Sequence, residues 1–470
     1  MPGYADMLVR PKNKIECAII FKICINCDLF LTISSGRTNL TGSATPTGGL
    51  ILSTSLLTSP ELVVDLKNKE VRSPVGIPLE DLRNKVLELS NKKYYYPVDP
   101  TSRYDAYVGG TLSCNASGFI PGRKGATRYW VKEIELLLPS GNLVHIERNQ
   151  YISNNGYFTL NECGNISKIP VPTYKRPKIK NASGIYSDSN GVVDFIDLII
   201  GSEGILGIMV SCTLGLARYP KNYLELFITL NSESEAIDFH DFLYDYFKQD
   251  MSKITALEYF GYNSKNYMKH KDFLFSNNKD VGIYLQIPIF KNSLNNKIEQ
   301  WVTILESFDS KLNLDNIIVL NDSLNWKKFF EARHSIPDNA LTKTKQLGGV
   351  SIITDTIVPP ENYKLYLKKV HQKLRKLKIE YLLFGHLGDC HLHFHLIPSG
   401  NQEKVCLEAY DYLIDLSSEL GGVYSAEHGT GKRKRNDFKK CYGEEAVQMI
   451  KKLKQSLDIK NYLNKGNIVN

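Results

Sequence analysis

Three glycine-rich segments constrain the fold of this 470-residue chain more than any other feature: residues 34–49 (SSGRTNLTGSATPTGG), 109–118 (GGTLSCNASG) and 201–207 (GSEGILG). Small residues after a strand let successive backbone N–H groups turn inward and form a concave nest for anions. Neither GxGxxG with a following acidic residue nor GxxxxGK[ST] occurs, which disfavours Rossmann and P-loop folds. Each segment alone also fits an ordinary polar turn. Together they predict a large, partly anionic ligand that backbone approaches from several sides.

The pattern of apolar residues changes near residue 220. Before it, short strands are predicted at 8–11, 29–33, 49–53, 130–141 and 142–146. After it, strands such as 221–230 alternate with amphipathic helices such as 234–248 and 361–378, in which apolar residues recur every three or four positions. We therefore predict two domains, 1–219 and 220–470, and an α+β layer of helices on a sheet for the second.

Charge and cysteine content narrow the class of protein. The 58 Lys and Arg exceed the 50 Asp and Glu by eight, an excess that suits an anionic cofactor, an acidic substrate or a membrane surface. No nucleic-acid-binding motif accompanies it, so we expect no nucleic-acid partner. Nine loosely spaced cysteines, an odd number, favour reduced thiols and a cytoplasmic location. No apolar run reaches the roughly 18 residues of a spanning helix, so membrane contact is expected to be at most peripheral, at the inner membrane face.

Five of the ten histidines lie within residues 386–428. His391, His393 and His395 alternate, so on a strand they would share one face while Leu and Phe point to the other. Glu427 and His428 add a carboxylate and another imidazole. Imidazoles with a carboxylate suit zinc or manganese, but a polar strand face without metal explains the spacing equally well.

The order of the motifs resembles one known family. The segments SSGRTNLTGSATPTGG, YPVDPTS, GGTLSCNASG, GATRYWV, IIGSEGILGI, FGHLGDCHLHFH and SAEHGTGKRK follow one another as in the FAD-linked oxidases. That family includes D-lactate and D-2-hydroxyglutarate dehydrogenases and the flavin subunit of glycolate oxidase. The resemblance implies a two-lobed FAD-binding domain of the vanillyl-alcohol-oxidase type, followed by an α+β substrate-binding cap domain. Relatives also carry a helix before the strand near Leu8, which Met1–Met7 cannot supply, so either the chain start is internal or that helix is missing.

The resemblance also assigns the cofactor contacts. Residues expected at the FAD pyrophosphate are Ser34, Ser35, Gly36, Arg37, Thr38, Asn39, Thr41 and Gly42. Residues expected around the flavin are Pro97, Asp99, Gly109, Gly110, Asn115, Ser117, Gly118, Glu203, Gly204, Ile208 and Asn464. Arg37 replaces a usual glycine, and a guanidinium beside a diphosphate favours binding. Lys465 and Asn467 replace a usual Pro and Lys, which weakens the match at Asn464. Residues 1–144 contain no histidine, so we predict non-covalent FAD.

By the same resemblance, His386, His393 and Glu427 would bind a divalent metal such as Zn or Mn. Some relatives work without metal, so both alternatives stay open. His428 would remove the proton of a substrate 2-hydroxyl as the C2 hydride passes to flavin N5. Arg333 would clamp the substrate carboxylate. His395 stands where many relatives have an Asn, and it would either form a hydrogen bond with the substrate or give a different specificity. Residues 351–354 contain no lysine before Asp355, unlike relatives that act on larger dicarboxylates, which favours a small monocarboxylate.

We therefore predict an FAD-dependent dehydrogenase that oxidises a small D-2-hydroxy acid, such as lactate or glycolate, to the 2-oxo acid. The alternatives are a flavin-dependent transferase resembling alkylglycerone-phosphate synthase and a catalytically inactive flavin subunit of an electron-transfer complex. No CxxCxxC-type iron–sulfur run is present, so electrons are expected to leave to a separate acceptor such as a quinone, a cytochrome or an electron-transfer flavoprotein. The oligomeric state is not predicted.

Overall fold

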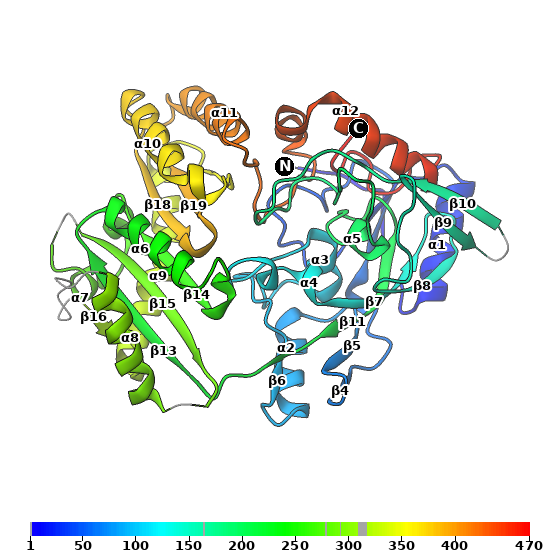
Figure 1. The fold of residues 1–470 in the computed structure, drawn as a ribbon. Coiled ribbons are helices and arrows are strands. Elements are labelled where there is room, and N and C mark those ends of the chain that lie inside the picture. Colours follow the sequence, from blue (N-terminus) through cyan, green and yellow to red (C-terminus); the bar gives the residue numbers. More distant parts are fainter. Residues whose placement is uncertain (1, 163–164, 278–279, 292, 309–316) are drawn as a thin grey trace. The chain divides into compact units, whose positions relative to one another are not determined.

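The computed structural model describes residues 2–162, 165–277, 280–291, 293–308 and 317–470. The chain forms two compact units (Figure 1). The first contains Met1–Gly118, Lys124–Tyr219 and Ser425–Asn470, and the second contains Phe119–Arg123 and Pro220–Tyr424. The boundary between the units at Tyr219 and Pro220 lies where the sequence pattern changes. Residues 425–470 group with the first unit, whereas the predicted domain limits place them in the second domain.

The first unit begins with a parallel three-stranded sheet in the order β1-β3-β2. Its strands are β1 (Met7–Val9), β2 (Leu31–Ser34) and β3 (Leu50–Ser53), and helix α1 (Lys14–Asn26) connects the first two. The side chain of Asn13 caps this helix by accepting from Glu16 N at 3.0 Å. Near the other end of the chain, Asn464 N donates to Leu31 O, so the C-terminal segment lies against β2.

An antiparallel five-stranded sheet forms the second part of this unit, in the order β4-β5-β11-β7-β8. These strands are β4 (Val63–Asp65), β5 (Glu70–Pro74), β11 (Ile208–Gly215), β7 (Val131–Leu137) and β8 (Leu143–Glu147). The helices of this unit are α2 (Leu79–Leu89), α3 (Val108–Cys114), α4 (Thr127–Trp130), α5 (Phe195–Ile199) and α12 (Arg435–Leu457). Two strand pairs complete it: β9 (Tyr157–Glu162) with β10 (Asn165–Pro170), and β6 (Tyr94–Tyr95) with β12 (Ala217–Arg218).

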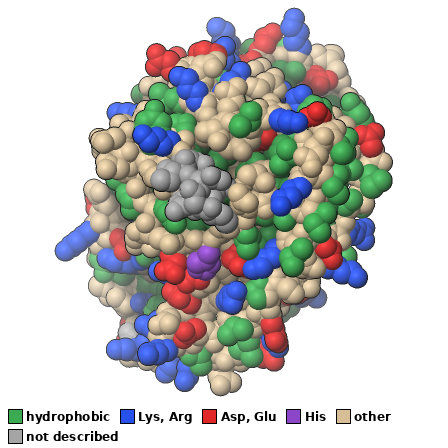
Figure 2. Space-filling model, turned by 90° about the vertical axis from the view of Figure 1, so that its right-hand side faces the viewer, with side chains coloured by type: hydrophobic (Ala, Val, Ile, Leu, Met, Phe, Trp, Pro, Cys, Tyr) green, Lys and Arg blue, Asp and Glu red, His purple; other side chains and the backbone are tan. Residues whose placement is uncertain are grey.

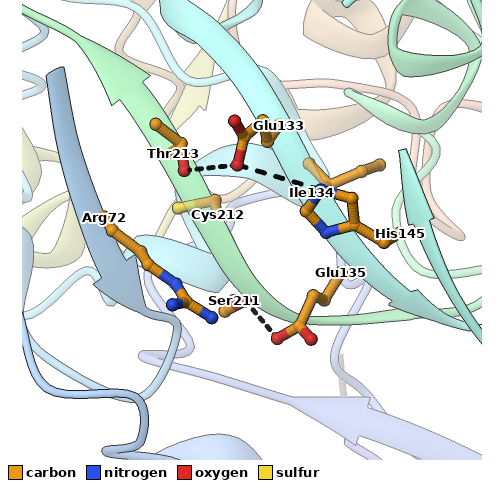
Figure 3. Close-up of a pocket in the computed structure, with 8 residues that line it drawn as sticks. All are labelled: Arg72, Glu133, Ile134, Glu135, His145, Ser211, Cys212 and Thr213. Carbon is orange, nitrogen blue, oxygen red and sulfur yellow. Dashed lines mark hydrogen bonds and ion pairs between the residues drawn. The ribbon is translucent and has the colours of Figure 1, made fainter. Parts of the chain in front are cut away.

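One face of the five-stranded sheet carries a pocket lined by polar and apolar side chains (Figure 3). Thr213 Oγ1 donates to Glu133 at 3.0 Å, and Ser211 Oγ donates to Glu135 at 2.6 Å. His145 lies between Glu133 and Glu147, which oppose each other across β7 and β8. These cross-strand pairs account for the polar side chains of the pocket as part of the sheet surface.

The second unit is built on an antiparallel seven-stranded sheet in the order β16-β13-β15-β14-β18-β19-β17. Its strands are β13 (Asn222–Leu230), β14 (Ala256–Phe260), β15 (Val281–Ile289), β16 (Ile317–Val319), β17 (Ile352–Ile353), β18 (Tyr381–His386) and β19 (His391–Leu396). Its helices are α6 (Glu233–Tyr246), α7 (Lys271–Leu274), α8 (Leu294–Phe308), α9 (Ser323–Gln346), α10 (Pro360–Lys376) and α11 (Glu403–Glu419). The sequence prediction of strands alternating with amphipathic helices is confirmed here.

Helices cover both faces of this sheet. Apolar side chains of α6, α8, α10 and α11 pack with one set of strand residues, including Leu224, Leu226 and Ile228 of β13. The alternate residue Phe227 points to the other face, where it packs with side chains of α7 and α9. This period of two is what a strand buried on both faces requires.

Figure 2 shows basic side chains scattered over the face drawn and acidic side chains gathered beside a histidine. Among the described residues, no helix combines the length and apolarity needed to span a membrane.

The aromatic contacts of Phe227 generate a stability prediction. Its side chain is fully buried, and its ring centroid lies 5.4 Å from that of Phe275 and 5.9 Å from that of Phe329. Phe227→Ala should lower the free energy of unfolding by about 3–5 kcal/mol, because it removes apolar contacts and leaves a cavity. Leu324→Ala on the exposed face of α9 is the control and should change it by less than about 0.5 kcal/mol. Urea denaturation measures both, and equal effects would contradict the assigned core.

Candidate active site

The glycine-rich segments converge around α3 in the first unit. A Cβ at Gly36 would lie 2.1 Å from Asp105 O, so only glycine allows the first segment to approach the chain before α3. The third segment is joined to the end of α3, since Gly201 N donates to Leu112 O and Glu203 N donates to Ser113 O. The predicted convergence of these segments is therefore present. Whether each residue contacts FAD stays a prediction.

Arg37 adopts a left-handed conformation, with a φ of 59°. Glycine reaches this region without strain, whereas a residue with a side chain loses roughly 1 kcal/mol or more. This explains why a glycine is usual at this position in the resembling family. Arg37 is exposed, so its guanidinium is available to the anion for which the loop is predicted.

The side chain of Asn39 shapes the predicted pyrophosphate loop. Its Oδ1 accepts from Thr41 N at 2.9 Å and from Ser43 N at 3.2 Å. Its Nδ2 donates to His428 O at 3.2 Å. Asn39 thereby connects the loop to the backbone of His428, the predicted base. The sequence pattern did not indicate this role.

Glu203 links three distant parts of the first unit. Its buried carboxylate accepts from Ser43 Oγ, Thr430 N and Gly431 N, each at 2.7 Å. Burial raises the pKa of Glu203, while these donors and Lys432 act in the opposite direction. The 427–431 segment is thus held against the loop that follows β2.

Asn464 is buried beside Glu203. Its Oδ1 accepts from Ile33 N at 2.7 Å, and its Nδ2 donates to Glu203 O at 2.8 Å. Both ends of the amide therefore bind backbone of the first unit. The sequence resemblance placed Asn464 at the flavin, and that contact stays a prediction beside the structural role seen here.

The remaining residues predicted at the flavin lie on the segments around α3. Asp99 packs against Gly118, where a Cβ would lie 2.0 Å from Asp99 Oδ1. Asn115 ends α3 in a left-handed conformation, and its Oδ1 accepts from Arg128 N at 2.9 Å. Pro97, Gly109 and Ile208 are buried in the same unit.

Glu427, a predicted metal ligand, also lies in the first unit, where it is partly buried. Its Oε2 lies 3.1 Å from Lys180 Nζ and accepts from Ser117 Oγ at 3.2 Å. The Lys180 side chain is almost fully buried, and sequence analysis missed it. A buried lysine beside a carboxylate compensates the negative charge of that carboxylate.

The predicted histidine strand is confirmed in the second unit as β19. Leu392, Phe394 and Leu396 pack into the core on one face. The imidazoles occupy the other face, and His391 is directly opposite His386 of β18. Ring nitrogens of His386, His391 and His393 lie within 4.8 Å of one another.

Hydrogen bonds distinguish the roles of these three imidazoles. His386 Nδ1 lies 2.6 Å from Glu258 Oε1, and His393 Nδ1 lies 3.0 Å from Thr354 O. Because these oxygens accept, Nδ1 carries the proton in both rings and the lone pair of the neutral ring is at Nε2. His391 differs, because its Nε2 lies at an ion-pair distance of 3.1 Å from Asp355 Oδ1. The donor chemistry of His386 and His393 therefore fits the metal ligands that the resemblance implies.

Arg333, the predicted carboxylate clamp, extends from α9 toward Glu258. Its Nη2 donates to Glu258 Oε2 at 2.9 Å, and its guanidinium lies 4.4 Å from the ring centroid of Phe119. Burial alone would raise the pKa of Glu258, but the contacts of its carboxylate with His386 and Arg333 outweigh burial and lower it to about 2. No sequence pattern indicated Glu258, because one glutamate in a strand has no distinctive spacing.

His395 is buried farther along β19. Its Nε2 lies 2.6 Å from Ser351 Oγ, whereas its Nδ1 has no hydrogen-bond partner within the described ranges. Burial, together with His393, lowers the pKa of His395 to about 4, so the ring is neutral near pH 7. A buried nitrogen without a partner is suited to bind a ligand.

These features define a two-unit protein with a nest of small residues in one unit and a cluster of imidazoles with an arginine in the other. A model of the FAD binding domain matches residues 5–147, and a model of the C-terminal domain of FAD linked oxidases matches residues 267–468. The chain belongs to the FAD-linked oxidase family and is an FAD-dependent oxidoreductase. The predicted family and fold class are confirmed.

Curated relatives resemble the chain over nearly its whole length. D-lactate dehydrogenase of Anaerostipes hadrus is 23% identical over 98% of this chain and 89% of that protein. Glycolate oxidase subunit GlcD of Bacillus subtilis is 23% identical over 98% of this chain and 88% of that protein. The mitochondrial D-2-hydroxyglutarate dehydrogenase of Danio rerio is 23% identical over 98% of this chain and 78% of that protein.

A solved structure of alkyldihydroxyacetonephosphate synthase resembles the structure of this chain with a TM-score of 0.64. The two chains are 15% identical, and the match covers 97% of this chain and 75% of the other. At this identity the likeness establishes the fold.

The left-handed conformation of Arg37 allows its charge to be tested without strain. Arg37→Gly should lower the affinity for FAD about tenfold, because it removes a cation predicted beside the diphosphate. Lys69→Gly is the matched control, since Lys69 has a φ of 58° in the turn between β4 and β5. Titration of the apoprotein with FAD at low and high salt measures the effect, which should shrink as salt increases. Equal affinities for Arg37→Gly and the unaltered protein would refute the predicted contact.

Proposed function

We propose that this protein is an FAD-dependent dehydrogenase that oxidises a small D-2-hydroxy acid, lactate-like or glycolate-like, to the 2-oxo acid. The observation that carries the proposal is the cluster of His386, His393 and Arg333 in the second unit. Imidazoles suit a hydroxyl group that must lose a proton, and a guanidinium suits a carboxylate. The names of the curated relatives, which include D-lactate and D-2-hydroxyglutarate dehydrogenases, support the same class of substrate.

Each of the predicted residues would have a separate role in the reaction. When bound, FAD supplies a hydride acceptor for the substrate C2. The first-unit loop that contains Gly36 and Asn39 would hold the pyrophosphate. Arg333 would orient the substrate carboxylate, and His428 would take the proton of the 2-hydroxyl group. His395 would bind the substrate through Nδ1, which has no hydrogen-bond partner among the described residues.

A divalent metal, zinc or manganese, fits the donor set of His386 and His393. Both rings are fixed through Nδ1 by an acceptor, as is usual for imidazoles that bind a metal through Nε2. A bound ion would polarise the 2-hydroxyl group and lower its pKa. We propose Glu427 as the carboxylate ligand of this set, in exchange for its ion pair with Lys180.

The environment of His395 favours a small monocarboxylate. Residues 351–354 supply a hydroxyl group at Ser351, bonded to His395 Nε2, and no lysine for a second carboxylate. We therefore propose lactate or glycolate rather than a dicarboxylate. A separate electron acceptor, such as a quinone, a cytochrome or an electron-transfer flavoprotein, would reoxidise the flavin.

A screen of flavin bleaching tests the proposal. Under anaerobic conditions, D-lactate or glycolate should bleach the flavin of the purified protein, and L-lactate should not. Bleaching that continues after verified removal of metal by a chelator would refute the metal role alone. Absence of bleaching by every 2-hydroxy acid would refute the proposed dehydrogenase and favour the transferase or the inactive subunit.

The role of His428 gives a second prediction. His428→Asn should lower the rate of flavin reduction about 10²–10⁴-fold, because the transition state loses its proton acceptor. His145→Asn, at an exposed histidine on the five-stranded sheet, is the control and should leave that rate unchanged. Stopped-flow absorbance measures both rates, and equal rates would remove His428 from the mechanism.

A further inference from the structure

Glu258 is a buried carboxylate that contacts two predicted site residues at once. Its side chain is 3% exposed and points from β14 to the face of the sheet that carries the imidazoles. Oε1 lies 2.6 Å from His386 Nδ1, and Oε2 accepts from Arg333 Nη2 at 2.9 Å. A buried carboxylate destabilises a protein unless its charge is compensated, so both contacts are required for burial.

Backbone geometry fixes one of these contacts. Glu258 and His386 are direct partners in the antiparallel pairing of β14 with β18. Opposed side chains on one face lie about 4.5–5.5 Å apart at Cβ. The strand pairing alone therefore places the Glu258 carboxylate beside the His386 imidazole. The sheet itself, rather than a mobile loop, therefore sets the orientation of His386.

The second contact reaches an arginine on a helix. Arg333 lies on α9, and Pro337 four residues later cannot donate the usual helical hydrogen bond to its carbonyl. Its guanidinium is held between Glu258 and the ring of Phe119, 4.4 Å from the ring centroid. The carboxylate thus fixes the position of the cation predicted to bind substrate.

We propose that Glu258 is a positioning residue that sets both the tautomer of His386 and the orientation of Arg333. The inference rests on the proposed function and deepens it. Glu258 Oε1 accepts from His386 and Oε2 accepts from Arg333, so His386 keeps its proton on Nδ1 and Nε2 is the ring atom that would bind a metal or a substrate hydroxyl. The other oxygen holds one guanidinium nitrogen, so the remaining ones are oriented for a substrate carboxylate.

The variant Glu258→Gln tests this double role, because an amide has one accepting end. If Gln Oε1 binds Arg333, the NH₂ group faces His386 Nδ1 and forces the proton to Nε2. If Oε1 binds His386, the NH₂ group faces the guanidinium and displaces it. One of the two functions must therefore fail in a variant of nearly the same shape.

The chain offers a matched control at Glu225 of β13. This carboxylate belongs to the same sheet and accepts from Tyr284 Oη at 3.0 Å and from Gln286 Nε2 at 2.6 Å, with no contact to an imidazole or arginine in the described part of the chain. Glu225→Gln should disturb the sheet to a similar extent and leave His386 and Arg333 in place.

Two measurements separate positioning from a purely structural role. Long-range ¹H–¹⁵N spectra of the holoenzyme labelled with ¹⁵N-histidine report the tautomer of His386, whose signals are identified by their loss in His386→Asn. Steady-state kinetics with D-lactate report KM and kcat. In Glu258→Gln we expect either the Nε2–H tautomer of His386 with a lower kcat, or a KM raised at least tenfold. Glu225→Gln should retain the tautomer and both constants.

The outcomes distinguish this inference from the proposed function. An unchanged tautomer together with an unchanged KM in Glu258→Gln would overturn the positioning role, as would equal changes in both variants. If D-lactate and glycolate are not oxidised by the unaltered protein, the proposed function fails, and the tautomer alone then decides the role of Glu258. If Glu258→Gln does not fold, Glu258→Asp is the second variant. Its side chain keeps the carboxylate but is one methylene shorter. An unaltered His386 tautomer and an unaltered KM in Glu258→Asp would likewise overturn the proposal.

Discussion

The arrangement of the first unit depends on the buried carboxylate of Glu203. It accepts hydrogen bonds from the loop after β2 and from the backbone of residues 430–431, while its own backbone carbonyl accepts from Asn464. Segments more than 200 residues apart in the sequence therefore meet at one side chain. Because an unpaired carboxylate in the interior is costly, Glu203 makes the glycine-rich loop and the C-terminal segment depend on each other.

A similar compensation of charge organises the second unit. Glu258 is buried in the interior with a hydrogen-bond donor on each carboxylate oxygen, one from His386 and one from the Arg333 cation. The same contacts that lower the cost of the buried carboxylate also orient the groups that we expect to meet the substrate. The same hydrogen bonds of Glu258 therefore stabilise the second unit and set the geometry of the candidate site.

Sequence patterns predicted the elements well, because they depend on local periodicity. The alternation of His391, His393 and His395 with Leu and Phe correctly indicated β19. The anion nest expected from the glycine-rich segments stays a prediction, although two of these segments meet at α3. Contacts between distant residues leave no local pattern, which is why Glu258 and Lys180 were missed. The same reason applies to residues 425–470, whose grouping with the first unit depends on long-range bonds such as that between Asn464 and Ile33.

The central claim is that a hydride leaves C2 of a D-2-hydroxy acid for the flavin. Anaerobic single-turnover reduction with D-lactate deuterated at C2 tests it most directly, because the C–H bond that breaks is the one labelled. The account predicts that the flavin bleaches and that deuterium slows the bleaching through a primary isotope effect. Equal rates with the two isotopologues, or no bleaching with either, would contradict it.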